Sequence, residues 1–248
     1  MAGVETLLDV EWFGQEELYF CGPAVAQMFL GYFKVAVSQD DLWTDVTNNT
    51  GGNRPASAPS TGHDFPQQVC HNCEVNTTRP PDWVCWDTTP EALQRVVNAR
   101  TSTVSLAVQY PSTFDQGVEM LIESLDRAPA VPPFATTTLL NHWVLVNGYM
   151  RDDFTATEAP AVQVGKYYLN GIYILDPLQL DAAQRVRLVA VRDWRAQFGS
   201  IACASDPNVN KHPIVVGGGL KLAAWAHPWR FAVITLILIL LWFWWISR

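Results

Sequence analysis

An uninterrupted apolar run near the carboxyl end constrains this chain more than any other feature. Residues 231–246 read FAVITLILILLWFWWI, sixteen residues without a charged side chain. A helix of that length spans about 24 Å, slightly less than the hydrocarbon core of a bilayer, which is about 30 Å thick. Trp229 precedes the run and three tryptophans lie at its other end, as in the aromatic belts at membrane interfaces. We therefore predict a membrane-spanning helix over residues 230–247, with a buried core helix as the alternative.

The charge distribution separates this tail from the rest of the chain. Residues 1–206 hold all 24 acidic residues and 12 of the 16 basic ones, a net charge of −12. So acidic a body argues against a nucleic-acid binder, which needs a basic face. Because only two residues follow the apolar run, we expect a single-pass tail anchor in the cell inner membrane or plasma membrane. The large domain would then face the cytoplasm, in weak agreement with the positive-inside rule.

The cysteines support a reducing compartment. Their number is odd, and the first ten residues lack the basic start and apolar run of a secretory signal. Free thiols are expected in the cytoplasm. The five cysteines are Cys21, Cys70, Cys73, Cys85 and Cys203.

Apolar periodicity and turn residues predict an α+β fold. Helices are expected over 22–33, after Ser38, from Thr88/Thr89 to Ala99, and over 114–128. Strands are expected over 104–110, 142–150, 167–175 and 186–191. Helices that precede a run of strands favour N-terminal helices packed on an antiparallel sheet. We expect one domain over 1–206, with 48–88 as a long loop or insertion, and a basic linker over 207–229. Within that linker, Ile214–Leu220 contains three glycines and predicts a flexible hinge.

One cysteine has the sequence context of a nucleophile. Cys21 precedes Gly22 and Pro23 at the start of a predicted helix, where the helix dipole and unpaired N–H groups stabilise a thiolate. Gln15 lies six residues upstream, and its amide N–H groups are suited to hold a developing oxyanion.

A base and an orienting acceptor follow later in the chain. His142 begins the apolar strand 142–150, and Asp176 ends the next one, 167–175. If the two strands pair antiparallel, these ends meet, so that Asp176 holds one ring nitrogen of His142 and the other faces Cys21. The alternative is a buried thiol and a core histidine without catalytic roles.

These motifs carry a resemblance to a known family. Gln15-x5-Cys21-Gly-Pro, His142-Trp-Val-x-Val-x-Gly-Tyr and Asp176-Pro177 resemble papain-like cysteine peptidases, over roughly residues 10–180. They look most like the bacteriocin-processing group, which cleaves after double-glycine leaders, and its bacterial relatives. The resemblance implies a papain-like fold with Cys21 as nucleophile, His142 as base and acid, Asp176 as its orienter and Gln15 as oxyanion donor.

The implied function is a membrane-anchored, cytoplasm-facing cysteine peptidase that needs no cofactor. Its partners would be a peptide or protein substrate, cut after small or glycine residues, and the bilayer. Two alternatives keep the same four residues: an inactive papain-like module that binds a partner at the membrane, and a thiol acyltransferase or amidase. Because the resembled group cuts after paired glycines, Gly217–Gly219 is also a candidate self-cleavage site.

A second cluster in the long loop suggests a metal or a disulfide. Cys70-x2-Cys73 is a plausible half of a zinc site, which Cys85 with a histidine would complete. A Cys70–Cys85 or Cys73–Cys85 disulfide and free thiols are the alternatives. The zinc candidates are Cys70, Cys73, Cys85, His63 and His71.

Overall fold

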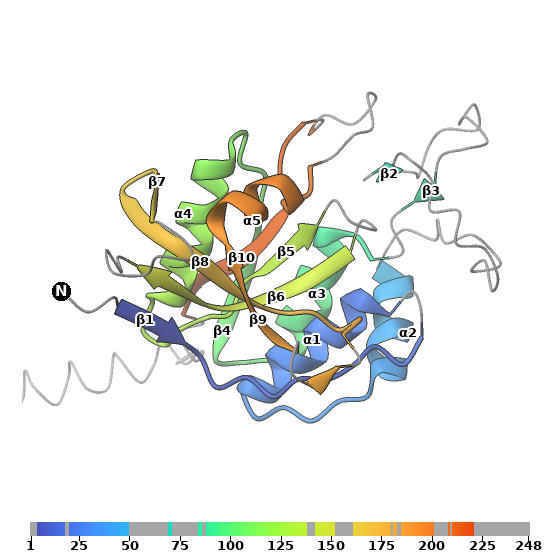
Figure 1. Ribbon diagram of the computed structural model, residues 1–248. Helices are drawn as coiled ribbons and strands as arrows, with labels where there is room; N and C mark the ends of the chain where they lie inside the picture. The colour runs from blue at the N-terminus through green and yellow to red at the C-terminus, as the bar shows by residue number, and fades with distance from the viewer. Residues whose placement is uncertain are drawn as a thin grey trace, which may run out of the picture.

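The computed structural model describes a little under two-thirds of the chain, in ranges that include every helix and strand named below (Figure 1). The described residues are 4–17, 20–49, 69–70, 84–85, 88–137, 142–151, 161–179, 181–182, 185–200, 208, 210 and 211–220. The predicted anchor over 230–247 lies outside these ranges, as does most of the predicted insertion over 48–88. Within them, no helix is long and apolar enough to cross a membrane.

Five helices are described, and the predicted helix starts are confirmed. They are α1 (Cys21–Tyr32), α2 (Gln39–Asn49), α3 (Pro90–Arg100), α4 (Phe114–Leu125) and α5 (Val191–Gln197). Thr89 caps α3, since its hydroxyl accepts a hydrogen bond from Ala92 N–H at 3.2 Å. Thr113 caps α4 in the same way through Gln116 N–H.

The strands form an eight-stranded antiparallel sheet, so the predicted α+β class is confirmed. The main order is β4-β10-β5-β6-β8-β7, with β1 added to β6 and β9 added to β8. These strands are β1 (Val4–Leu7), β4 (Val104–Gln109), β5 (Phe134–Thr137), β6 (His142–Arg151), β7 (Val162–Val164), β8 (Tyr167–Leu175), β9 (Val186–Ala190) and β10 (Ile214–Leu220). Separately, β2 (Val69–Cys70) and β3 (Val84–Cys85) form a short parallel pair.

Helices cover the two faces of the sheet (Figure 1). Helices α1, α2 and α3 share one hydrophobic core with Trp143 and Leu145 of β6, whereas α4 and α5 share a second core with Val144 and Val146. Alternating side chains of one strand therefore enter opposite cores. This two-sided burial explains why the sequence of β6 is continuously apolar.

The glycine segment predicted as a flexible hinge is instead a strand inside the sheet. β10 pairs with β4 on one side and with β5 on the other. A Cβ atom on Gly217 would lie only 3.1 Å from the side chain of Val131, so glycine permits close packing there. The hinge prediction is wrong, and the domain continues to Leu220 rather than ending at residue 206. Peptide bonds held in a central strand also argue against self-cleavage at Gly217–Gly219.

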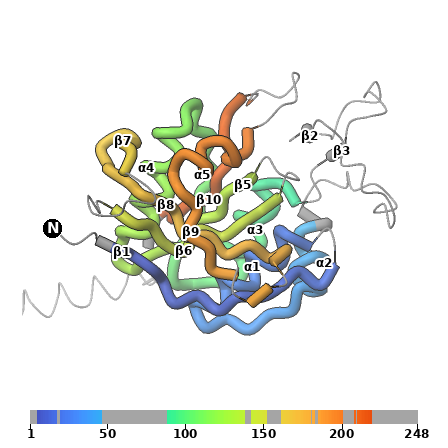
Figure 2. Tube along the Cα trace, in the orientation of Figure 1, coloured from blue at the N-terminus to red at the C-terminus, as the bar shows by residue number. Residues whose placement is uncertain are grey.

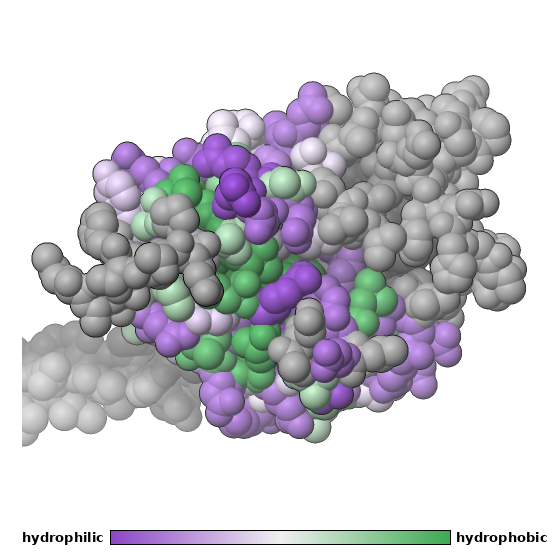
Figure 3. All heavy atoms as spheres, viewed as in Figure 1, coloured by the Kyte–Doolittle hydropathy of each residue, from purple (hydrophilic) through white to green (hydrophobic). Residues whose placement is uncertain are grey.

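Part of the sheet remains uncovered. Leu7, Val186 and Leu188 are exposed on β1 and β9. Figure 3 shows hydrophobic residues gathered in the middle of the face in view, between more hydrophilic ones.

A substitution at Ser124 tests whether β10 contributes to the stability of the folded domain. Its buried hydroxyl donates to Val131 O at 2.7 Å and accepts from Gly217 N–H at 2.9 Å. Ser124→Ala leaves both backbone groups unsatisfied, so we expect the free energy of unfolding in urea to fall by about 2 kcal/mol. Ser112→Ala, at an exposed position, is the control and should change it by less than about 0.5 kcal/mol. Equal stabilities for the two variants would contradict the placement of β10.

Candidate active site

Cys21 is the first residue of α1 and carries a free, partly exposed thiol. The first turn of this helix contains no acidic residue, so the partial positive charge of its N-terminus is not offset there. A Cβ atom on Gly22 would lie 2.4 Å from the hydroxyl of Thr88. Glycine after the cysteine is therefore needed for the close approach of α1 to the segment before α3.

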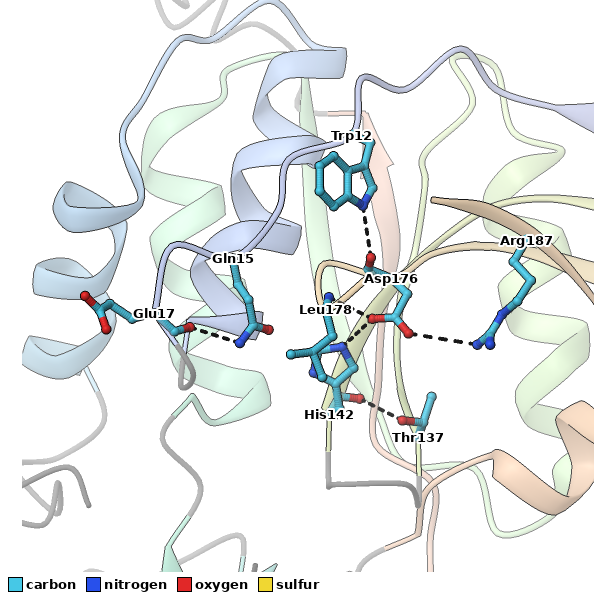
Figure 4. A network of polar contacts seen from close by, with 8 residues as sticks. All are labelled: Trp12, Gln15, Glu17, Thr137, His142, Asp176, Leu178 and Arg187. Atoms are coloured by element: carbon cyan, nitrogen blue, oxygen red, sulfur yellow. Dashed lines mark hydrogen bonds and ion pairs between the residues drawn. The ribbon is translucent and has the colours of Figure 1, made fainter. Parts of the chain in front are cut away.

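His142 and Asp176 meet because β6 and β8 are antiparallel neighbours. Leu145 pairs with Leu175, so the start of β6 lies beside the end of β8. His142 Nε2 lies 2.8 Å from Asp176 Oδ1, and the two residues are only 5% and 8% exposed. The predicted juxtaposition of these two side chains is thus present (Figure 4).

The surroundings favour a charged pair. Burial, the largest effect, lowers the pKa of His142, but hydrogen bonds to Asp176 and Cys21 and the charges of both raise it to about 9. Burial likewise tends to raise the pKa of Asp176, but the hydrogen bond and charge of His142, the Leu178 N–H and Arg187 together lower it. His142 thus bonds Asp176 through one ring nitrogen and interacts with the thiol of Cys21 as well.

Gln15 is held against the turn that follows β8. Its backbone N–H donates to Pro177 O at 3.0 Å, and the nearby Trp12 Nε1 donates to Asp176 O at 2.9 Å. The side-chain Nε2 donates to Glu17 O at 2.9 Å. Oε1 is buried and has no hydrogen-bond partner among the described residues. Figure 2 shows how the segment from β1 to α1 runs beside the sheet to reach this place.

Three further contacts were not predicted from the sequence. Leu178 N–H donates to Asp176 Oδ1 at 3.0 Å, and Arg187 Nη2 lies 3.9 Å from Oδ2, so both carboxylate oxygens face positive partners. Trp143 Nε1 donates to Thr88 O at 3.0 Å. Gln15 and Arg187 lie on opposite sides of the His142–Asp176 pair in Figure 4. Arg187 lies on a strand that pairs with β8, and only that pairing could have revealed it.

The predicted metal cluster falls mostly outside the described residues. The backbones of Cys70 and Cys85 lie opposite each other in the parallel pair of β2 and β3. His63, His71 and Cys73 are outside the described ranges. No group of three or more potential ligands is placed to hold a metal ion in the part of the chain that the structure describes. The zinc and disulfide alternatives therefore stay predictions.

Comparison with known proteins identifies a family. Residues 7–201 match the Peptidase_C39 like family. The fold is similar to that of a double glycine motif protease from an AMS/PCAT transporter, solved in complex with the leader peptide, at 12% identity and a TM-score of 0.45, covering 86% of this chain and 93% of that one. It is also similar to that of a putative C39-like peptidase from Bacillus anthracis, at 13% identity and a TM-score of 0.47, covering 86% and 97%. No curated protein matches the chain.

The raised pKa of His142 predicts how the reactivity of Cys21 depends on pH. At pH 6 His142 is protonated, and a positive charge beside a cysteine favours the attack of its sulfur on an electrophile. Iodoacetamide should therefore alkylate Cys21 at least about tenfold faster at pH 6 in the natural protein than in His142→Ala, as measured by peptide mass spectrometry.

The difference should shrink above pH about 9, where His142 loses its proton. The raised pKa of His142 also determines how the stability of the fold changes with pH. Protonated His142 stabilises the fold fully below pH about 6.5, and this contribution is lost as the pH rises through about 9. Equal alkylation rates for both proteins at pH 6 would show that His142 does not activate the thiol.

Proposed function

This chain belongs to the Peptidase_C39 like family, and we propose that it is a cysteine peptidase with Cys21 as nucleophile and His142, held by Asp176, as base and acid. One observation carries the proposal. A buried His142–Asp176 hydrogen bond of 2.8 Å lies beside a free cysteine at the start of a helix. A merely structural histidine would not need both a buried carboxylate and a partly exposed thiol.

The first half of the reaction forms an acyl-enzyme. The Cys21 thiolate attacks the carbonyl carbon of the peptide, a C–S bond forms, and the carbonyl electron pair moves to oxygen. The Cys21 N–H and the amide of Gln15 stabilise this oxyanion. Gln15 Nε2 has two hydrogens, and its bond to Glu17 O uses one of them. The electron pair then returns, the C–N bond breaks, and the imidazolium of His142 gives its proton to the leaving amine.

The second half releases the acid and restores the site. Neutral His142 removes a proton from water as the water oxygen attacks the thioester carbonyl carbon. When the C–S bond breaks, the peptide acid leaves and the thiolate–imidazolium pair is regenerated. Asp176 keeps its negative charge throughout and orients the imidazole. Apart from the attacking water, every group that acts in the proposed cycle belongs to the chain, so the mechanism uses no cofactor.

A peptide library provides the test. New amino termini should appear with the natural protein, disappear with Cys21→Ala and fall roughly a hundredfold in rate with Asp176→Asn. Asp193→Asn, at an exposed site on α5, is the matched control and should leave the rate unchanged. The rate should also decline above pH about 9, because neutral His142 cannot protonate the leaving amine. A cleavage rate that survives Cys21→Ala would refute the proposal.

The sequences of the cleaved peptides test which residues the site accepts before the scissile bond. We propose small or glycine residues before the scissile bond, in keeping with the family resemblance. Equal cleavage after glycine and after bulky residues would contradict that preference. If no library peptide is cut although Cys21 is reactive, the inactive partner-binding module or an acyltransferase becomes the better account.

We further propose that residues 231–246 attach the domain to a membrane with the site facing the cytoplasm. The support is the sequence of the run alone, sixteen uncharged residues with tryptophans at its borders. The full chain should float with liposomes in a density gradient and resist alkaline carbonate, whereas a chain ending at residue 222 should remain at the bottom. Residue 222 lies beyond β10, so the truncation spares the sheet. Equal flotation of both proteins would place the lipid contact elsewhere.

A further inference from the structure

A buried glutamine holds the backbone on both sides of Gln15. Gln39 is the first residue of α2 and is only 1% exposed. Its Nε2 donates to Gly14 O at 2.7 Å, and its Oε1 accepts from Glu16 N–H at 3.0 Å. Gln15 therefore lies between two residues whose backbones are bonded to one side chain.

The remaining donor of this glutamine connects it to the helix that carries Cys21. Gln39 Nε2 also donates to Gln27 Oε1 at 3.0 Å, and Gln27 in α1 donates to Val37 O at 2.9 Å. Both N–H groups and the oxygen of Gln39 are thus used, which offsets the cost of burying an amide. The start of α2 is itself fixed by the Ser38 hydroxyl, which accepts from Asp41 N–H at 3.1 Å.

The opposite side of the Gln15 loop is bonded to the sheet. Gln15 N–H donates to Pro177 O, directly after Asp176. The loop is irregular over residues 8–17, so no helix or strand of its own fixes its position. Its conformation depends instead on Gln39 on the side of the helices and on the turn after β8 on the side of the sheet.

We propose that Gln39 is a positioning residue that holds Gln15 at the oxyanion site beside Cys21. The inference rests on the proposed function, in which Gln15 stabilises the oxyanion. An oxyanion donor acts only if it is fixed in place before the charge develops, because reorganisation during the reaction costs free energy. Gln39 supplies this fixation by joining the loop to the same helix that carries the nucleophile.

Two reactions of the Cys21 thiolate distinguish a loss of Gln15 positioning from a general loss of folding. The thiolate attacks the carbonyl carbon of p-nitrophenyl acetate and forms a tetrahedral intermediate with a negatively charged oxygen. This intermediate then releases p-nitrophenolate and leaves the cysteine acetylated. Iodoacetamide alkylates the same thiolate by displacing iodide from a saturated carbon, and no oxyanion forms. The ratio of the two rates at Cys21, corrected with Cys21→Ala for the other cysteines, reports the oxyanion site without a known peptide substrate.

The full chain and its variants should give a definite pattern. Gln15→Ala should lower the acylation-to-alkylation ratio by about a hundredfold, and Gln39→Met by about tenfold, with alkylation changed less than about twofold. The double variant Gln15→Ala/Gln39→Met should be no slower in acylation than Gln15→Ala alone, because Gln39 acts only through Gln15. Gln27→Met, a milder change, should lower the ratio in the same direction.

Ser124→Ala is the control for a general loss of stability. It removes buried hydrogen bonds far from Gln39 in the fold, and it should keep the acylation-to-alkylation ratio of the natural protein. If Gln15→Ala lowers the ratio but neither Gln39→Met nor Gln27→Met does, the positioning role is wrong and the proposed function stands. If the losses from Gln15→Ala and Gln39→Met multiply in the double variant, Gln39 acts independently of Gln15 and the inference also fails. If Cys21 is not acylated in the natural protein, or Gln15→Ala keeps the natural ratio, the proposed oxyanion chemistry itself is wrong.

Discussion

The antiparallel pairing of β6 with β8 is the constraint on which the rest of the site depends. It brings the first residue of one strand, His142, beside the residue after the other, Asp176, at 2.8 Å. The strands lie between two hydrophobic cores, so a register shift of one residue would move each apolar side chain into the opposite core, where its neighbours differ in size and shape. The packing of the whole domain therefore enforces the geometry of one hydrogen bond, and no flexible loop intervenes between these side chains and the sheet.

Cys21 belongs to a different layer, and polar contacts couple its surroundings to the sheet. Trp143, next to His142, donates to the backbone of Thr88, whose side chain packs on Gly22 beside Cys21. The loop that carries Gln15 provides a second connection, since it is bonded both to the turn after Asp176 and to Gln39. The bonds made by Trp143 and Gln39 join buried side chains to the backbone, where hydrogen bonds are costly to break, and the bond between Gln15 and Pro177 joins backbone to backbone. The site is thus preorganised by two separate links between the helical layer and the sheet.

Local sequence patterns predicted the elements whose formation depends on neighbouring residues in the chain. The capped start of α3, the amphipathic α4 and the apolar β6 and β8 follow from capping residues and periodicity. The His142–Asp176 contact could be predicted because it required only one assumption, that two strands consecutive in the predicted order pair with each other. The segment 214–220 was misjudged because three glycines indicate flexibility when neighbours are unknown, whereas in the fold β10 pairs with β4 and β5 and a Cβ atom on Gly217 would lie 3.1 Å from Val131. Gln39 and Arg187 were missed for a related reason: their contacts join residues far apart in sequence, and no local pattern marks them.

The central claim is that His142 is a charged partner of both Asp176 and Cys21, and its titration tests this most directly. In protein labelled with 15N at histidine, NMR should show the His142 ring protonated at both nitrogens up to a pKa of about 9. In Cys21→Ala the pKa should be lower, since the hydrogen bond and the charge of the cysteine both raise it. A His142 that titrates near 6.5 in both proteins would contradict the account, because the histidine would then be coupled to neither partner.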